Sequence, residues 1–121
     1  MTVAVGQIKQ EVISILNLNI SPCTIFWGES NRQHVEHNHP ATYQKYGTML
    51  ESVIRDILDV PDYVGYRNKA IEYIKTMPDK EILKVAVRAS KQNIFFVRTI
   101  YPIWQNELDS FLANKTLVKT R

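Results

Sequence analysis

Apolar residues recur every three to four positions near the middle of the chain, which is the period of a helix with one buried face. The apolar positions on that face are Tyr46, Leu50, Val53, Ile54, Ile57 and Leu58. Charged residues fall on the other side, and Pro61 closes the segment because the residue before a proline is pushed out of helical geometry. The pattern predicts an amphipathic helix that begins near Tyr43 and stops before Pro61.

Beyond Pro61 the apolar period changes to two, in short segments rich in β-branched and aromatic residues. These segments are residues 63–67, 70–75, 82–89 and 94–101. Short polar stretches typical of turns separate them. Their close spacing favours an antiparallel meander.

The pattern is less regular at the two ends of the chain. Apolar residues from Ile8 to Leu16 suggest a first helix, although Val12–Leu16 could also form a strand, and residues 23–28 are typical of a strand. Pro102 is expected to start a final helix, and residues 114–121 to form a loosely held basic tail. The predicted fold is α+β, with N-terminal helices, a four-stranded antiparallel sheet and a C-terminal helix, in one domain over residues 1–121.

Composition and charge exclude few functions. The chain has 121 residues, 45% of them apolar, and a net charge of +3, which permits binding to a polyanion without requiring it. Its one cysteine, Cys23, can form neither an intramolecular disulfide nor a cysteine-based zinc site within the chain, and this fits a reducing cytoplasm best. No signal peptide or membrane-spanning run is evident, so we expect no membrane partner.

All three histidines lie within the stretch QHVEHNHP: His34, His37 and His39. Imidazole groups suit zinc, nickel or copper, but a helix would place His39 on a different side from His34 and His37, and no compelling fourth ligand is visible. An acid-base site needs less, because RNA cleavage by its own 2′-hydroxyl requires a base, an acid and cations near the phosphate. Two histidines can serve both proton transfers.

The predicted strands offer cations and aromatic rings for such a site. Alternation places Lys84 and Arg88 on one strand face, where they form either a basic surface or ordinary solvated positions. Arg98 interrupts a strongly apolar segment, so it should either form a buried ion pair or face a cleft. Tyr43 and Tyr66 are candidates for stacking on the bases of single-stranded RNA.

Seven short motifs occur in a fixed order along the chain: GES, HVEHNHP, YQKYG, PDYVG, IEYIK, VAVRAS and FVRTIY. This order resembles that of the phage and mobile-element nuclease-like domains grouped with barnase, EndoU, the colicin ribonucleases and RelE, and the resemblance covers about residues 5 to 115. It implies a ribonuclease-like fold and a metal-independent endoribonuclease that acts as a toxin or effector. The turn at residues 67–70 is shorter and plainer than the glycine- and serine-containing turn expected there.

The resemblance also assigns residues to a candidate site. His34 and His39 match the two histidines of the family motif, while His37 matches a variable position. The other matching polar positions are Arg88, Arg98, Thr99 and Tyr101. With Lys84, Tyr43 and Tyr66 as substrate contacts, we expect RNA as the partner and no cofactor or metal. A cognate inhibitor or immunity protein is the further partner that this resemblance implies. The alternative is a non-catalytic module that binds RNA or a protein on the same scaffold.

Overall fold

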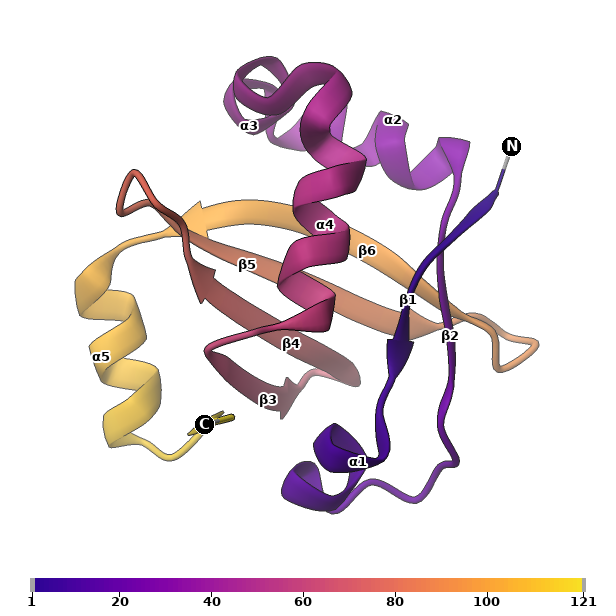
Figure 1. Ribbon diagram of the computed structural model, residues 1–121, viewed down its shortest axis with the longest axis vertical. Coiled ribbons are helices and arrows are strands. Elements are labelled where there is room, and N and C mark those ends of the chain that lie inside the picture. The colour runs from indigo at the N-terminus through magenta and orange to yellow at the C-terminus, as the bar shows by residue number, and fades with distance from the viewer. Residues whose placement is uncertain (1, 121) are drawn as a thin grey trace.

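The computed structural model describes residues 2–120 and contains a seven-stranded mixed sheet (Figure 1). The strands run in the spatial order β1-β2-β6-β5-β4-β3-β7. Their bounds are β1 Val3–Ile8, β2 Cys23–Trp27, β3 Tyr63–Arg67, β4 Ala70–Thr76, β5 Ile82–Ala89, β6 Phe95–Ile103 and β7 Leu117–Lys119. The helices are α1 Gln10–Leu16, α2 Glu29–Asn38, α3 Pro40–Tyr46, the 3₁₀ turn η1 Gly47–Met49, α4 Leu50–Asp59 and α5 Gln105–Ala113.

The predicted meander is confirmed, because β3, β4, β5 and β6 are consecutive antiparallel neighbours. The turn between β3 and β4, which contains neither glycine nor serine, closes a tight hairpin. Its two central residues, Asn68 and Lys69, both have left-handed backbone conformations, with φ of 55° and 64°. This is the geometry of the two-residue turns that match strand twist, so the hairpin forms without the expected glycine.

The prediction of a four-stranded sheet was wrong, because strands are added at both ends of the meander. On one side β2 runs parallel to β6, and β1 pairs antiparallel with β2. On the other side β7 pairs with β3, and Leu117 is buried. Residues 117–119 are therefore held in the sheet rather than loose. Both additions are pairings between distant segments, which a local apolar period does not encode.

Three helix boundaries also differ from the prediction. Residues 3–8 form strand β1, so the chain begins its structure with a strand, and helix α1 follows it. The long central helix is divided into α3 and α4 at Gly47, whose φ of 50° is left-handed. Pro102 lies inside β6 rather than starting a helix. Because β2 pairs with β6 only at Phe95 and Phe96, β6 is an edge strand at Pro102 and tolerates the missing N–H donor.

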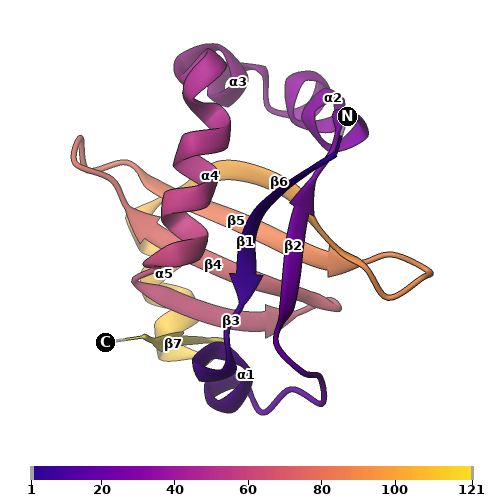
Figure 2. The same cartoon turned by 45° about the vertical axis from the view of Figure 1, so that its right-hand side comes forward.

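The two faces of the sheet carry separate apolar clusters. Figure 2 shows α4 in front of the meander. On one face α4 packs with α1, β1 and β2 over the meander, and Tyr73, Leu83 and Val85 lie in this cluster. On the other face α5 covers one end, where Leu108 packs with Ile74 and its neighbours. Helices α2 and α3 lie beside β6. No helix within residues 2–120 is long and apolar enough to cross a membrane.

Candidate active site

His39 lies at the junction between α2 and α3, where the backbone leaves helical geometry with φ −136° and ψ 60°. Pro40 is the first residue of α3, a position where its missing N–H is not needed. The His39 N–H donates to the carbonyl of Val35 at 2.8 Å, which ties the junction to the last turn of α2. Because α2 packs beside β6, the His39 ring stacks on Tyr101, with centroids 4.7 Å apart and an interplanar angle of 14°.

His34 lies beside His39, with ring centroids 6.4 Å apart in an edge-to-face arrangement. The Asn38 amide nitrogen is 3.0 Å from His34 Nδ1 and 3.1 Å from the His34 carbonyl oxygen. An amide nitrogen only donates hydrogen bonds. In this contact Nδ1 is therefore the acceptor, and a neutral His34 ring carries its proton on Nε2. Burial, and then the charge of His34, lower the pKa of His39 below its usual 6.5, so its imidazole is neutral near pH 7.

The sheet also brings a lysine to Tyr101. Lys84 is the direct partner of Tyr101 in the β5–β6 ladder, and its Nζ lies 4.9 Å from the centre of the Tyr101 ring. The same Nζ is 3.0 Å from a carboxylate oxygen of Glu72, which Arg67 contacts at 3.2 Å. Lys84 and Glu72 are only 3% and 6% exposed. The sequence placed Lys84 either on a basic surface or at an ordinary solvated position, and its burial contradicts both.

Arg98 and Thr99 are placed by a β-bulge in β6. Ala86 pairs with Thr99, whereas the next residue, Val87, pairs with Val97, so Arg98 is the extra residue. Arg98 is exposed and forms no ion pair within residues 2–120, which contradicts a buried ion pair. The Thr99 hydroxyl is buried and has no hydrogen-bond partner in the described part of the chain. A bulge next to these groups is a common device for aiming side chains at a ligand.

Comparison with known proteins shows the family of this chain. Residues 3–110 match the family model described as phage-Barnase-EndoU-ColicinE5/D-RelE like nuclease3. The chain belongs to this family. No curated protein and no solved structure matches the chain. The family assignment supports a nuclease domain with a nucleic acid substrate.

Arg88, another predicted site residue of this nuclease domain, lies apart from His34 and His39. It is exposed, it is opposite Phe96 in the ladder, and its guanidinium donates to the carbonyl of Asn68 at 3.1 Å. Arg88 lies four positions after Lys84 along β5, which corresponds to roughly 13 Å of extended strand. The structure thus brings His34, His39, Tyr101 and Lys84 into one group and leaves Arg88 at the far end of β5.

The two tyrosines predicted to stack on RNA bases lie outside this group. Tyr43 is half-buried and packs against the apolar cluster under α4, so its role is packing. Tyr66 is 52% exposed. Alternation along β3 places its side chain on the same sheet face as Val64, whereas Glu72 lies on the opposite face. His37 is exposed on α2. Residues 2–120 contain no group of three or more His, Cys, Asp or Glu side chains arranged to hold a metal ion.

Sequence reasoning missed Glu72 and Arg67. Glu72 joins the cations Lys84 and Arg67 into one buried network, and Arg67 also lies over the Phe111 ring, with its guanidinium carbon 4.4 Å from the ring centre. The signal was present in the motif IEYIK, because alternation places Glu72 on the same face as the apolar Ile74. A carboxylate on an apolar face of a central strand requires a buried cation as its partner.

Proposed function

We propose that this chain is a metal-independent endoribonuclease in which His34 and His39 transfer protons. The observation that supports this most is the chain of contacts from His34 to His39, from His39 to Tyr101 and from Tyr101 to Lys84. Two imidazoles and a cation close together are the groups that cleavage of RNA by its own 2′-hydroxyl requires.

The two histidines take different roles in this proposal. His39 is neutral near pH 7 because its pKa is lowered, so it removes the proton from the 2′-hydroxyl. The 2′-oxygen attacks the phosphorus, the bond to the 5′-oxygen breaks, and a 2′,3′-cyclic phosphate forms. His34 acts in its imidazolium form and delivers the proton of Nε2, the nitrogen that the Asn38 contact leaves free, to the departing 5′-oxygen. After this step His39 carries one proton more and His34 one fewer, and hydrolysis of the cyclic product or exchange with solvent restores both.

The cations of the sheet stabilise the charge that develops on the phosphate. Lys84 is held against Tyr101 by Glu72, and Arg98 extends from the bulge with its guanidinium unpaired among the described residues. A guanidinium binds phosphate oxygens in a bidentate way. Tyr101 positions the substrate through its contact with His39, and Thr99, whose buried hydroxyl has no hydrogen-bond partner among the described residues, holds the bulge beside it. Arg88, at the far end of β5, would bind a neighbouring phosphate.

Incubation of the pure protein with RNA in the presence of EDTA tests the proposal. Cleavage with 2′,3′-cyclic phosphate ends is expected, and His39→Ala should lower its rate by about 10²-fold or more, because a general acid or base contributes at least that much. His37→Ala is the matched control, since His37 lies in the same stretch but is exposed and outside the group. Unchanged cleavage in His39→Ala would remove His39 from the mechanism, and loss of cleavage with EDTA would contradict metal independence.

A non-catalytic module that binds RNA or a protein is the second candidate. The observation that favours it is the burial of Lys84, whose charge is already paired with Glu72. Binding of RNA without cleavage in the same assay would support this alternative.

The biological setting that we propose is a toxin or effector from a phage or mobile element, acting in the cytoplasm and controlled by a cognate inhibitor or immunity protein. Expression of the active chain without an inhibitor should then slow bacterial growth, and His39→Ala should relieve the effect. Equal growth inhibition by both variants would contradict a toxic nuclease.

A further inference from the structure

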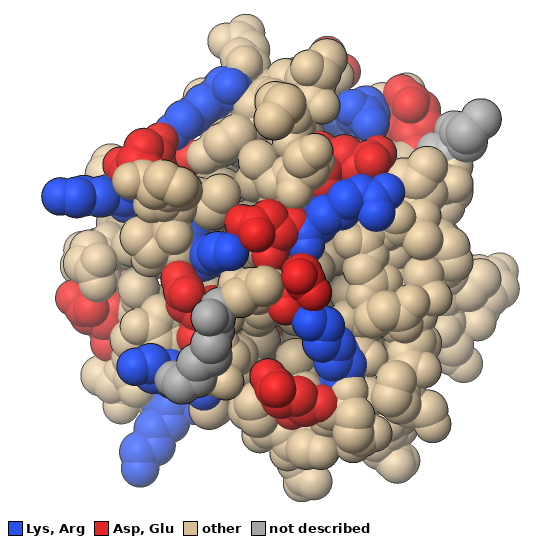
Figure 3. All heavy atoms as spheres, viewed as in Figure 1, with Lys and Arg blue, Asp and Glu red and all other residues tan. Residues whose placement is uncertain are grey.

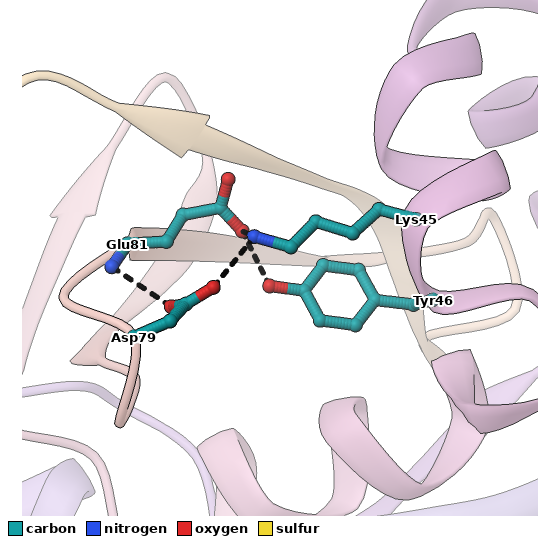
Figure 4. A network of polar contacts seen from close by, with 4 residues as sticks. All are labelled: Lys45, Tyr46, Asp79 and Glu81. Carbon is teal, nitrogen blue, oxygen red and sulfur yellow. Dashed lines mark hydrogen bonds and ion pairs between the residues drawn. The ribbon is translucent and has the colours of Figure 1, made fainter.

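A pocket of about 570 Å³ lies at the end of β6, beyond the residues of the candidate active site. Its apolar lining consists of Ile82, Pro102, Ile103 and Trp104. Its polar wall includes Lys45, Asp79 and Glu81, which contact one another, and Tyr46 joins the same network through Glu81 (Figure 4). Pockets of this size with an apolar lining and a few polar groups are typical of sites for small flat molecules.

Trp104 is the prominent feature of this pocket. Its side chain is 77% exposed, whereas the only other tryptophan, Trp27, is 1% exposed. Its backbone is held in place, because the Trp104 N–H donates to the Glu107 carboxylate at 3.1 Å at the start of α5. An exposed indole on a fixed backbone is a preformed platform for stacking, with little conformational entropy to lose on binding.

Both walls of the pocket are close along the chain to residues of the proposed active site. Trp104 lies three positions after Tyr101, just beyond the end of β6, which is roughly 10 Å of extended chain. Lys45 follows His39 by six residues through α3, which is roughly 9 Å. A chain bound at His39 and Tyr101 therefore reaches this pocket within a short distance.

The charge of the pocket indicates which part of a nucleic acid it accepts. Lys45 is paired with Asp79 at 2.7 Å and with Glu81 at 3.0 Å, so its charge is neutralised. Lys80 adds one further cation, and the four charged residues of the lining sum to zero. A neutral wall offers no net attraction to phosphate, but it suits an uncharged base, whose amino groups can donate to the carboxylate oxygens.

We propose that this pocket is a subsite for one base of single-stranded RNA, next to the cleaved phosphate, and that the base stacks on Trp104. This inference rests on the proposed function, because it takes the substrate to be RNA bound at His39 and Tyr101. Stacking on an aromatic side chain contributes substantially to binding of single strands and tolerates any base, since every base has a π-face.

Fluorescence titration with a short single strand of 2′-O-methyl RNA, about six nucleotides long, tests the subsite. This probe lacks the free 2′-hydroxyl, so it binds without being cleaved. The fluorescence of the exposed indole should be quenched on binding. Trp104→Ala should abolish the quench and weaken binding, measured by anisotropy of a labelled strand, by about 5- to 100-fold. Trp104→Phe should recover much of the affinity, because a phenyl ring still stacks.

Val118→Ala is the control, since Val118 is exposed on the edge strand β7, which β5, β4 and β3 separate from β6. Equal affinity of the wild type, Trp104→Ala and Val118→Ala would overturn the subsite. No quench by any strand would also overturn it and would leave Trp104 as a candidate contact for a protein. The readout is independent of catalysis: binding that depends on Trp104 without any cleavage of RNA would reject the proposed function alone, and cleavage without an effect of Trp104 on affinity would reject the subsite alone.

Discussion

The two faces of the central strands are equally well buried but chemically opposite. On the α4 side, Leu83 and Val85 of β5 are fully buried in an apolar cluster. On the α5 side, Lys84 of the same strand and Glu72 of β4 are almost as inaccessible, yet they carry opposite charges and contact each other at 3.0 Å. Residues that alternate along β5 therefore enter two different environments, an apolar cluster on one face and a buried ion pair on the other.

Exposed charged side chains also differ between the two sides of the molecule in whether they form ion pairs. On the side viewed in Figure 3, acidic and basic side chains are interspersed. Several of them pair around α4, as in the contacts Lys9–Asp59, Lys75–Asp56 and Arg55–Glu51. In contrast, Arg98 and Arg88 of β6 and β5 are exposed and form no ion pair within residues 2–120. A phosphate can therefore bind these two guanidinium groups without displacing a carboxylate.

The largest effect is expected from Glu72→Ala, which leaves Lys84 buried without its carboxylate. Breaking a buried ion pair costs about 3–5 kcal/mol of the free energy of unfolding, comparable with about 2–5 kcal/mol for the cavity mutant Leu83→Ala on the other face. Urea unfolding followed by circular dichroism measures both changes. A loss below about 1 kcal/mol for Glu72→Ala would show that the network is not desolvated.

A double variant sharpens this test. In Glu72→Leu with Lys84→Met, both charges are replaced by apolar groups, so most of the lost stability should return. Cleavage of RNA should not return, because Lys84 is a proposed contact of the phosphate. Recovery of cleavage together with stability would mean that the buried charges serve only the fold.

Arg98→Ala should give a smaller effect, and on function rather than on stability. Because Arg98 is exposed and unpaired among residues 2–120, the free energy of unfolding should change by less than about 0.5 kcal/mol. Loss of a charge-assisted contact to the phosphate should lower cleavage by about ten- to hundredfold. Initial rates with RNA and urea unfolding of the same preparation measure the two quantities. Unchanged rates would place the phosphate elsewhere.

The smallest effect concerns the pH dependence of stability. The pKa of His39 is lowered in the folded chain, so the unfolded chain binds a proton more readily. The contribution of His39 to the free energy of unfolding is complete above its unfolded pKa of about 6.5. This contribution is lost as the pH falls through the lower pKa of the folded chain. Urea unfolding from about pH 8 to about pH 5 should therefore show a shallower decline in His39→Gln than in the wild type. Equal slopes would mean that His39 titrates normally.

The local features of this chain were largely predictable. Alternation located β3 to β6, because a strand with one face in an apolar core must repeat every two residues. The helix before Pro61 was predicted from its apolar period, but its division at Gly47 was not, since a single glycine inside a helical pattern does not reveal a left-handed turn. The outer strands β1 and β7 were missed because their partners lie far away in the sequence.

The candidate site was predictable only in part. The motifs contained His34, His39 and Tyr101, and the structure brings these three together. The role of Glu72 was not recognised, and the environment of Lys84 was misjudged, because alternation shows which residues share a face but not whether another element covers that face.

The sequence by itself determined the period of each segment and the presence of a histidine cluster that ends at Pro40, because these depend on neighbouring residues and on proline geometry. Only the tertiary structure decided that His39 stacks on Tyr101, that Lys84 is held between Tyr101 and Glu72, and that Arg98 is pushed outward by a bulge. These contacts join α2, α3, β4, β5 and β6, and packing between distant segments is set by the complete fold rather than by local preference.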